Sequence, residues 1–295
     1  MPRAKKYSPT QLASLLPQPA KDANKYSRGK LVCIAGCSDY PGAAALAALA
    51  GQRMGAGYTQ VFCAPEAVNS VRAAAAPSIV VGSWLQLSEA FRTKNCHPTA
   101  FLVGSGMQKN TPATHELVCN TLASITQPVL VDGGGIASLA TSDARQILKQ
   151  RFVNGFETVI TPHAGEAKTL ADKFGFPTNS PAKLAQLLSL AYGAVAVVKG
   201  PTTFVSNGNA TYKMNSGTQA LAKAGTGDVL AGMIASLLAQ GIKSVDACML
   251  GTTLHAHAGI IASEKLTDIC VVPEDVIAEI PTAIRHVSKA AAKVK

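Results

Sequence analysis

Short apolar, β-branched runs alternate with longer helical patterns along almost the whole chain of 295 residues. The runs that we expect to form strands are Leu31–Ala35, Thr59–Cys63, Ser78–Val81, Thr99–Val103, Val129–Asp132, Thr158–Thr161 and Val195–Lys199. Helical patterns lie near residues 42–54, 111–125, 142–150, 165–174, 181–192, 228–240, 245–263 and 274–284. Such alternation predicts an α/β fold, a three-layer α/β/α sandwich with a mostly parallel central sheet.

One interruption of this alternation is expected after the seventh strand. Thr203–Val205 and Ala210–Met214 flank Asn207-Gly208, a dipeptide typical of the tight turn in an antiparallel hairpin. No internal repeat or low-complexity linker divides the sequence. We therefore expect a single domain over residues 1–295, with an N-terminal extension over 1–26 and a basic tail over 285–295.

The net charge of +10 is concentrated at the two ends of the chain. Residues 1–30 hold seven basic residues and one acidic residue, and residues 283–295 hold four basic residues and no acidic one. The body between them is therefore close to neutral. Because a nucleic-acid binder needs a basic face on its folded body, we expect no nucleic-acid partner.

The seven cysteines are scattered, without a CxxC pair or the spacing of metal ligands. This pattern is typical of reduced thiols in the cytoplasm. The N-terminus is polar, and apolar stretches such as Ala43–Ala50 are too short to cross a bilayer. We expect a cytoplasmic protein with no membrane partner.

Polar or glycine-rich segments follow several of the expected strands. They are Gly36–Gly42, Gly104–Met107, Asp132–Gly135, Thr161–Glu166 and Lys199–Thr203. In open α/β sheets, ligands bind outside the carboxyl ends of the strands, where such segments meet. We therefore expect the functional site at this edge of the sheet.

The most informative string is Ala224–Asp228, which runs directly into a helical pattern. Gly225 and Gly227 let the backbone come close to a ligand, and a helix start presents unpaired N–H groups and the positive end of its dipole. This combination is suited to a transferring phosphoryl group. Asp228 has a second interpretation, as a residue that only caps the helix.

The order of these segments resembles the ribokinase-like superfamily, and more closely its ADP/ATP-dependent NAD(P)H-hydrate dehydratase family. The segments that carry the resemblance are Tyr7–Pro19, Tyr26–Lys30, Ala35–Gly57, Val103–Met107, Pro128–Asp132, Ile160–Glu166, Val198–Thr203, Asn215–Gly232 and Val272–Ile284. The resemblance implies a carbon–oxygen lyase that phosphorylates the C6 hydroxyl of the S-epimer of hydrated NADH or NADPH and then eliminates phosphate. It also implies ADP or ATP as co-substrate, Mg²⁺ as the metal and a homotetramer.

The resemblance implies particular roles for residues in these segments. Asp228 would take the proton of the substrate hydroxyl, beside the amides of Gly225 and Gly227. Ala43, Gly106 and His163 would contact the hydrated dinucleotide together with Asp228. Glu166 would order Mg²⁺ through water. The residues that would bind the nucleotide are Lys199, Gly200, Pro201, Thr202, Thr203 and Gly227.

Three positions depart from the family pattern. Asp132-Gly133-Gly134-Gly135 lacks a second acidic residue that some members carry, Ala164 replaces a proline, and Gly217-Thr218 replaces a frequent Gly-Asn. None of these changes removes a charged group that the resemblance assigns to catalysis. They leave open the preferences between ADP and ATP and between NADH and NADPH hydrate.

Several of these residues also have a structural interpretation. His163 can simply face solvent, Glu166 can begin a helix, where negative charge is favoured, and Asp132 can cap a turn. Lys199 can be an ordinary surface lysine. A further pair, His255 and His257, lies two residues apart, which places the rings on different faces of a helix, so we expect packing rather than metal binding.

Two other functions fit the same fold. A small-molecule kinase would phosphorylate a thiazole or pyrimidine alcohol and release a stable phosphorylated product. A nucleotide-sensing protein with an inactive kinase fold would bind nucleotide without turnover. Many members of the resembling family carry an N-terminal epimerase domain, and about 30 residues precede the first expected strand here, so we expect any epimerase to be a separate chain.

Overall fold

The centre of the structure is one nine-stranded sheet. The computed structural model describes residues 5, 7–91, 97–214 and 217–292. Its strands are β1 (Lys30–Ile34), β2 (Tyr58–Cys63), β3 (Val80–Ser83), β4 (Thr99–Val103), β5 (Val129–Val131), β6 (Thr158–Ile160), β7 (Val195–Val198), β8 (Phe204–Ser206) and β9 (Thr211–Lys213). They lie in the order β3-β2-β1-β4-β5-β6-β7-β8-β9, parallel through β7 and antiparallel from β7 to β9. The expected mostly parallel sheet with a final hairpin is confirmed.

Both faces of the sheet are buried, which explains why its strands read as continuous apolar runs. In β1, Leu31 and Cys33 pack into one hydrophobic layer, while Val32 and Ile34 pack into the other. Neighbouring side chains point to opposite faces of a strand, so a buried strand needs apolar residues at every position. The sheet therefore sits between two hydrophobic cores.

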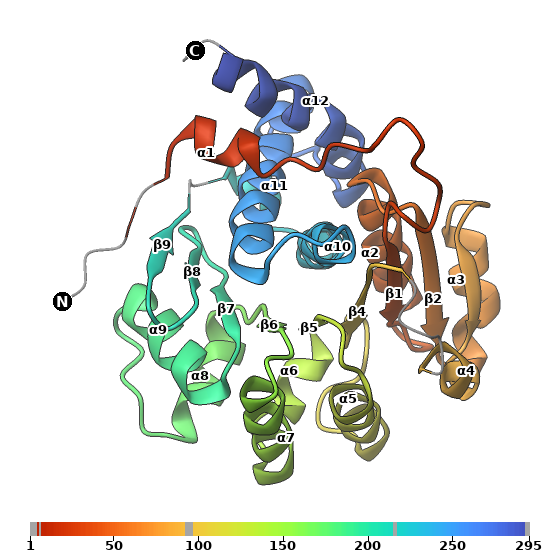
Figure 1. The fold of residues 1–295 in the computed structure, drawn as a ribbon, viewed down its shortest axis with the longest axis vertical. Coiled ribbons are helices and arrows are strands. Elements are labelled where there is room, and N and C mark those ends of the chain that lie inside the picture. Colours follow the sequence, from red (N-terminus) through yellow and green to blue (C-terminus); the bar gives the residue numbers. More distant parts are fainter. Residues whose placement is uncertain (1–4, 6, 92–96, 215–216, 293–295) are drawn as a thin grey trace.

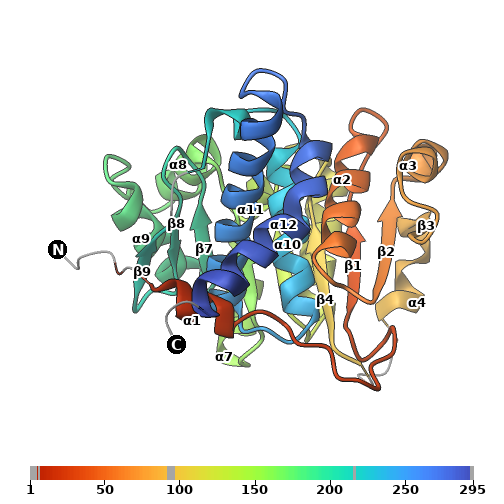
Figure 2. The same ribbon diagram turned by 90° about the horizontal axis from the view of Figure 1, so that it is seen from above.

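Helices cover both of these faces and make the three expected layers (Figure 1). One layer contains α1 (Pro9–Ser14), α2 (Pro41–Arg53), α3 (Val68–Ala74), α10 (Thr226–Ala239), α11 (Ser244–Leu266) and α12 (Pro273–Ala292). The other contains α4 (Leu87–Phe91), α5 (Pro112–Ser124), α6 (Gly134–Ser138), α7 (Ser142–Val153), α8 (Ala164–Asp172) and α9 (Pro181–Tyr192). Figure 2 shows α2, α10, α11 and α12 lying across the strands on the first face. The short helices α1, α3, α4 and α6 are additions to the sequence-based expectation.

Helix α10 packs unusually close to α2. A Cβ atom on Gly232 of α10 would lie 2.0 Å from the carbonyl oxygen of Ala47 in α2, so only glycine fits there. The facing side of α2 is built from buried alanines, among them Ala44 and Ala48. Twelve of the fourteen residues of α10 are buried. The small residues of this sequence thus place α10 in the interior of the molecule, directly over the sheet.

The loops after β4 and β5 pack backbone to backbone at the carboxyl edge of the sheet. Gly104 has a φ of +112°, and a Cβ atom there would lie 2.2 Å from the carbonyl oxygen of Asp132. Because only glycine tolerates both the conformation and the contact, Gly104 fixes where Asp132 emerges from β5.

The outer edge strand β9 pairs with the chain's N-terminal segment. The N–H of Lys5 donates to the carbonyl of Thr211, and the N–H of Lys213 donates to the carbonyl of Lys5. The six described cysteines are free thiols, and Cys96 lies outside the described residues. Among the described helices, none combines the length and the apolar character needed to span a membrane.

Candidate active site

A cavity of about 1070 Å³ lies at the carboxyl ends of β5, β6 and β7, facing the start of α10. It gathers most of the residues that the sequence analysis singles out. Those that line it are Asp132, His163, Glu166, Lys199, Gly200, Pro201, Thr203, Gly225, Gly227 and Asp228. The predicted site residues that do not line it are Ala43, Gly106 and Thr202. The site therefore lies at the expected edge of the sheet.

One wall of the cavity is the N-terminus of α10. Gly225 is the N-cap and has a φ of +96°, and the N–H groups of Gly225 and Gly227 find no acceptor in the described part of the chain. Thr226 closes the preceding loop, since its hydroxyl donates to the carbonyls of Leu221 and Lys223. Unpaired amides at the start of a buried helix form an anion-binding site.

Helix α10 begins two residues earlier than the sequence pattern predicts. Asp228 is therefore the third residue of the helix, and the capping position belongs to Gly225. The alternative in which Asp228 only caps the helix is wrong. Its carboxylate lies in the first turn and lines the cavity.

Asp132 is the centre of a buried polar network at four neighbouring strand ends. Its Oδ1 accepts hydrogen bonds from Lys199 Nζ (2.7 Å) and Thr161 Oγ1 (2.6 Å), and its Oδ2 accepts one from Ser105 Oγ (3.2 Å). A Cβ atom on Gly227 would lie 3.5 Å from Lys199 Nζ, so the amine sits beside the helix start. The network thus holds a positive charge next to the unpaired amides.

The carboxyl of Asp228 has an unusual electrostatic environment. Burial, together with the negative charge of Asp132, raises its pKa to about 7, while a hydrogen bond with Ser105 and the charge of Lys199 oppose the rise. A group that titrates near neutral pH is matched to the work of a general base.

The amine of Lys199 remains protonated at neutral pH. Burial acts to lower its pKa, but the negative charges of Asp132, Glu166 and Asp228 outweigh burial and raise the pKa. A fixed positive charge in a partly dehydrated cavity is suited to hold phosphate oxygens.

His163 and Glu166 form a reciprocal cap at the start of α8. The Nδ1 atom of His163 accepts from the N–H groups of Gly165 (3.0 Å) and Glu166 (3.3 Å), and Glu166 Oε2 accepts from the N–H of His163 (2.9 Å). The Nε2 of His163 lies 3.2 Å from Glu166 Oε1, and Lys109 Nζ lies 3.6 Å from the same oxygen. The helix-start interpretation of Glu166 is thus confirmed. Both side chains also line the cavity, so the cap fixes the orientation of two groups that face it.

Ala43 and Gly106 lie together: Ala43 is in the first turn of α2, after β1, and Gly106 is in the loop that follows β4. A Cβ atom on Gly106 would lie 2.7 Å from the Cβ of Ala43, and the N–H of Cys37 donates to the carbonyl of Gly106 (2.9 Å). Their contact with substrate stays a prediction. The segment Asn215-Ser216, which belongs to the family resemblance, lies outside the described residues.

Three further residues belong to the site. Ser105 and Thr161 orient Asp132. Each is a polar residue at or just after the end of a predicted strand, and this position is the signal in the sequence that points to them. His255 is buried, lines the cavity, and has no hydrogen-bond partner for its Nε2 among the described residues. Burial lowers its pKa to about 4, so the ring is neutral. His255 therefore both packs in the interior and faces the cavity, whereas the packing interpretation expected only the first. His257 does not line the cavity.

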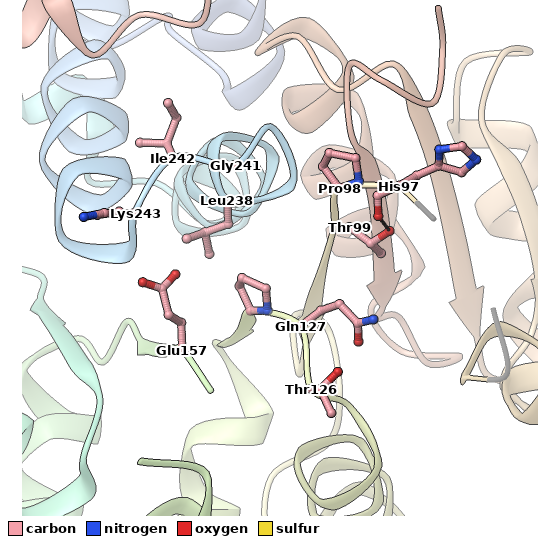
Figure 3. Close-up of a pocket in the computed structure, with 11 residues that line it drawn as sticks. His97, Pro98, Thr99, Thr126, Gln127, Glu157, Leu238, Gly241, Ile242 and Lys243 are labelled. Carbon is pink, nitrogen blue, oxygen red and sulfur yellow. Dashed lines mark hydrogen bonds between the residues drawn. The ribbon is translucent and has the colours of Figure 1, made fainter. Parts of the chain in front are cut away.

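A second cavity, of about 320 Å³, lies at the opposite, amino ends of the strands (Figure 3). There Glu157, just before β6, extends toward the connection between α10 and α11, which carries Lys243. None of the predicted site residues lines this cavity.

The fold places the chain in a known class of proteins. It is similar to an ADP/ATP-dependent NAD(P)H-hydrate dehydratase of Bacillus subtilis, solved with ATP and Mg²⁺, with a TM-score of 0.82, 21% identity, and coverage of 97% of this chain and 100% of that one. A ribokinase-like superfamily protein of Enterococcus faecalis gives a TM-score of 0.81 at 23% identity, covering 97% of each chain. Together with the sheet topology, these likenesses define a ribokinase-like fold.

Sequence comparison narrows this class to one family. The model of a family described as NAD(P)H-hydrate dehydratase matches residues 31–282. The ADP-dependent (S)-NAD(P)H-hydrate dehydratase of Listeria monocytogenes is 30% identical over 97% of this chain and 98% of its own length. The bifunctional NAD(P)H-hydrate repair enzyme of Salinibacter ruber is 33% identical over 83% of this chain, which spans only 45% of that relative. The chain belongs to the NAD(P)H-hydrate dehydratase family.

Proposed function

We propose that this chain uses ADP or ATP to dehydrate the S-epimer of NADH or NADPH hydrate back to the reduced cofactor. The observation that carries the proposal is the position of Asp228, a carboxyl with a pKa of about 7, between an amide-rich helix start and the Lys199 amine in one cavity. At about 1070 Å³, the cavity is at the upper end of ordinary ligand pockets, which suits two reactants. Family membership supports the choice of substrate.

The chemistry explains why a kinase site is useful for a dehydration. Hydroxide is a poor leaving group, so the C6 oxygen is first phosphorylated while Asp228 accepts its proton. The amides of Gly225 and Gly227 donate to the equatorial oxygens of the transferring group, and Lys199 offsets its charge. The electron pair of the ring nitrogen then expels phosphate, and loss of a proton from C5 restores the double bond.

The two substrates divide the cavity between them in this proposal. The segment from Lys199 to Thr203, with Gly227, binds the nucleotide beside the protonated amine. His163 binds the hydrated dinucleotide, with its ring positioned by the cap on α8. Ala43 in the first turn of α2 and Gly106 in the loop after β4 complete that side.

The carboxylates of the cavity fit Mg²⁺, which prefers oxygen ligands and is usually held by one or two carboxylates and substrate phosphates. Glu166 and Asp132 supply such oxygens. Glu166 would hold the ion through water, because both of its oxygens already have partners in the cap. Bound Mg²⁺ would offset negative charge on the nucleotide phosphates.

The decisive experiment incubates the protein and Mg²⁺ with hydrated NADH and either ADP or ATP. The proposal requires recovery of reduced-nicotinamide absorbance and release of one free phosphate per NADH recovered. A stable phosphorylated product would instead indicate a small-molecule kinase, for which the likeness to a Pyrococcus horikoshii hydroxyethylthiazole kinase, at 14% identity, shows only the shared fold. Tight nucleotide binding without any turnover would indicate a sensing protein.

The pH dependence of kcat/KM provides a prediction for this site. Asp228 must be deprotonated to accept the substrate proton, and its pKa is about 7. We expect kcat/KM to be constant above this pH and to fall about tenfold per pH unit below it. Initial rates measured on both sides of pH 7 at subsaturating substrate check this. A profile that stays flat down to about pH 5 excludes a base with a raised pKa.

The assembly and the setting of the protein are part of the proposal. We infer a homotetramer in the cytoplasm, as the family resemblance implies; light scattering of the purified protein tests the assembly. Because the proposed reaction consumes only the S-epimer, an epimerase acting on the R-epimer would complement it.

A further inference from the structure

Three side chains of different chemistry converge on the outer face of helices α5 and α7, outside the cavity. His115 and Cys119 lie one turn apart on α5, and Asp143 lies in the first turn of α7. The imidazole Nε2 of His115 is 2.8 Å from Asp143 Oδ2 and 3.7 Å from the Cys119 sulfur. The donor atoms of all three residues lie within 4.8 Å of one another. In the described part of the chain, no other His, Cys, Asp and Glu side chains form such a group.

The shape of this group distinguishes it from a proton relay. In a relay, the thiol and the carboxylate would contact opposite nitrogens of the imidazole ring. Here the carboxylate bonds to Nε2, and the sulfur is nearer to Nε2 (3.7 Å) than to Nδ1 (3.9 Å). The sulfur lies almost equidistant from the two ring nitrogens, so it sits beside the ring, and the Cys119 side chain has to turn for nitrogen, sulfur and oxygen to face one common point.

The donors lie close enough together to reach the spacing around a tetrahedral zinc ion after small side-chain movements. With ordinary Zn–S, Zn–N and Zn–O bond lengths, tetrahedral angles place nitrogen and sulfur about 3.6 Å apart and nitrogen and oxygen about 3.3 Å apart. The nitrogen–sulfur distance of 3.7 Å is close to this value, but the sulfur has to move from beside the ring to the lone-pair side of Nε2. The nitrogen–oxygen distance of 2.8 Å is that of a direct hydrogen bond and needs to open by about half an ångström.

We propose that His115, Cys119 and Asp143 bind one Zn²⁺ ion, with water as the fourth ligand. One imidazole, one thiol and one carboxylate form a borderline-soft donor set, which favours zinc over Mg²⁺ or Ca²⁺. The group is accessible, since the His115 side chain is 32% exposed and the Asp143 side chain 59% exposed. Binding displaces the thiol proton and the proton shared by His115 and Asp143.

Such an ion would cross-link two helices that follow active-site loops. Helix α5 follows the loop that contains Ser105, and α7 follows the segment that begins with Asp132 and continues through α6. Ser105 and Asp132 bond to each other at the cavity. The zinc site would therefore be a structural clamp behind the two loops that hold Ser105 and Asp132.

Direct metal binding to the full chain tests the site. Protein purified with a chelator and a reductant, and free of nucleotide, is titrated with Zn²⁺ and separately with Co²⁺. We expect one equivalent of tightly bound Zn²⁺, and a Co²⁺ adduct with a thiolate charge-transfer band and tetrahedral ligand-field absorption. We also expect the melting temperature to rise with Zn²⁺ concentration, because the ion binds the folded state.

Three variants separate the site from incidental binding. Cys119→Ser should abolish the charge-transfer band, and Asp143→Asn, which keeps the side-chain shape, should weaken Zn²⁺ binding by at least about tenfold. Cys270→Ser is the matched control, because Cys270 is an exposed free thiol outside this group. Equal Zn²⁺ affinity of the wild type and Cys119→Ser, or a thiolate band lost only in Cys270→Ser, overturns the proposal.

Discussion

Replacing Asp228 by asparagine should stop turnover while nucleotide still binds. The amide cannot accept the proton of the C6 hydroxyl, and removal of a positioned base typically lowers the rate by about 10²- to 10⁴-fold. The side chains have the same shape, so the amides of Gly225 and Gly227 and the Lys199 amine stay in place. Steady-state rates and nucleotide titration by calorimetry provide the measurement. Near-normal turnover removes Asp228 from the mechanism.

The same variant should be more stable than the wild type above pH 7. In the folded wild type the pKa of Asp228 is raised from its ordinary value to about 7, mainly by burial. Deprotonation is therefore harder in the folded state, so the group costs stability increasingly as the pH rises from about 4 to 7. Asparagine avoids this cost.

Melting temperatures across that pH range identify the effect. The difference between Asp228→Asn and the wild type should grow toward neutral pH and then level off. Loss of both turnover and stability would instead mean that the asparagine disturbs the fold. The combination of an inactive and stabilised protein is specific to a buried carboxyl kept for function.

Of the substitutions proposed for this protein, Lys199→Met should lower the free energy of unfolding the most. The amine is the cationic partner of Asp132, whose side chain is only 3% exposed. Removing one partner of a buried pair leaves an uncompensated charge, which costs about 3–5 kcal/mol. We expect the lower end of this range, because Ser105 and Thr161 still bond to Asp132. Urea unfolding measures the change.

Two companion variants test the physical cause. Lys168→Met removes an exposed pair with Asp172 and should cost only about 0.3–0.5 kcal/mol. Lys199→Met combined with Asp132→Asn should recover part of the loss, because no buried charge is then left alone. Equal destabilisation by Lys199→Met and Lys168→Met contradicts the buried-pair explanation.

The pH dependence of kcat/KM in Lys199→Met should also show a change in the pKa of Asp228. The positive charge of Lys199 lowers the pKa of Asp228, so its removal should raise that pKa further. The fall of kcat/KM at low pH should then begin at a higher pH than in the wild type. The value of kcat/KM on its plateau should also be lower, because the contact between Lys199 and phosphate is lost. An unchanged pH dependence would mean that the two groups are not coupled.

The strands and the place of the site were predictable because local chemistry determines them. A strand buried on both faces must be apolar throughout, and Thr99–Val103 and the Asn207-Gly208 turn meet such local rules directly. Polar residues placed just after parallel strands gather at one edge in any fold of this kind. The approach of His163, after β6, and Lys199, after β7, to one cavity follows from this rule.

The remaining features depend on contacts between distant segments. Thr226–Asp228 is a poor helix-forming string, yet it is helical because Gly225 takes a left-handed conformation and the Thr226 hydroxyl bonds to the preceding loop. Helix α6 begins at Gly134, where a Cβ atom would lie 2.1 Å from the carbonyl oxygen of Met107. The bond between Asp132 and Lys199 passes across the end of β6. No local pattern in the sequence signals such contacts.

The deep burial of α10 has a consequence for the proposed phosphoryl transfer. Helix α10 packs against the sheet, α2 and α11, and we expect it to open only when the whole molecule unfolds, so that its first amides keep one orientation. No dipoles would then need to be turned toward the phosphate during transfer, which would remove a reorganisation contribution from the barrier. Ligands would enter and leave past Gly200 and Pro201, which line the cavity and are exposed.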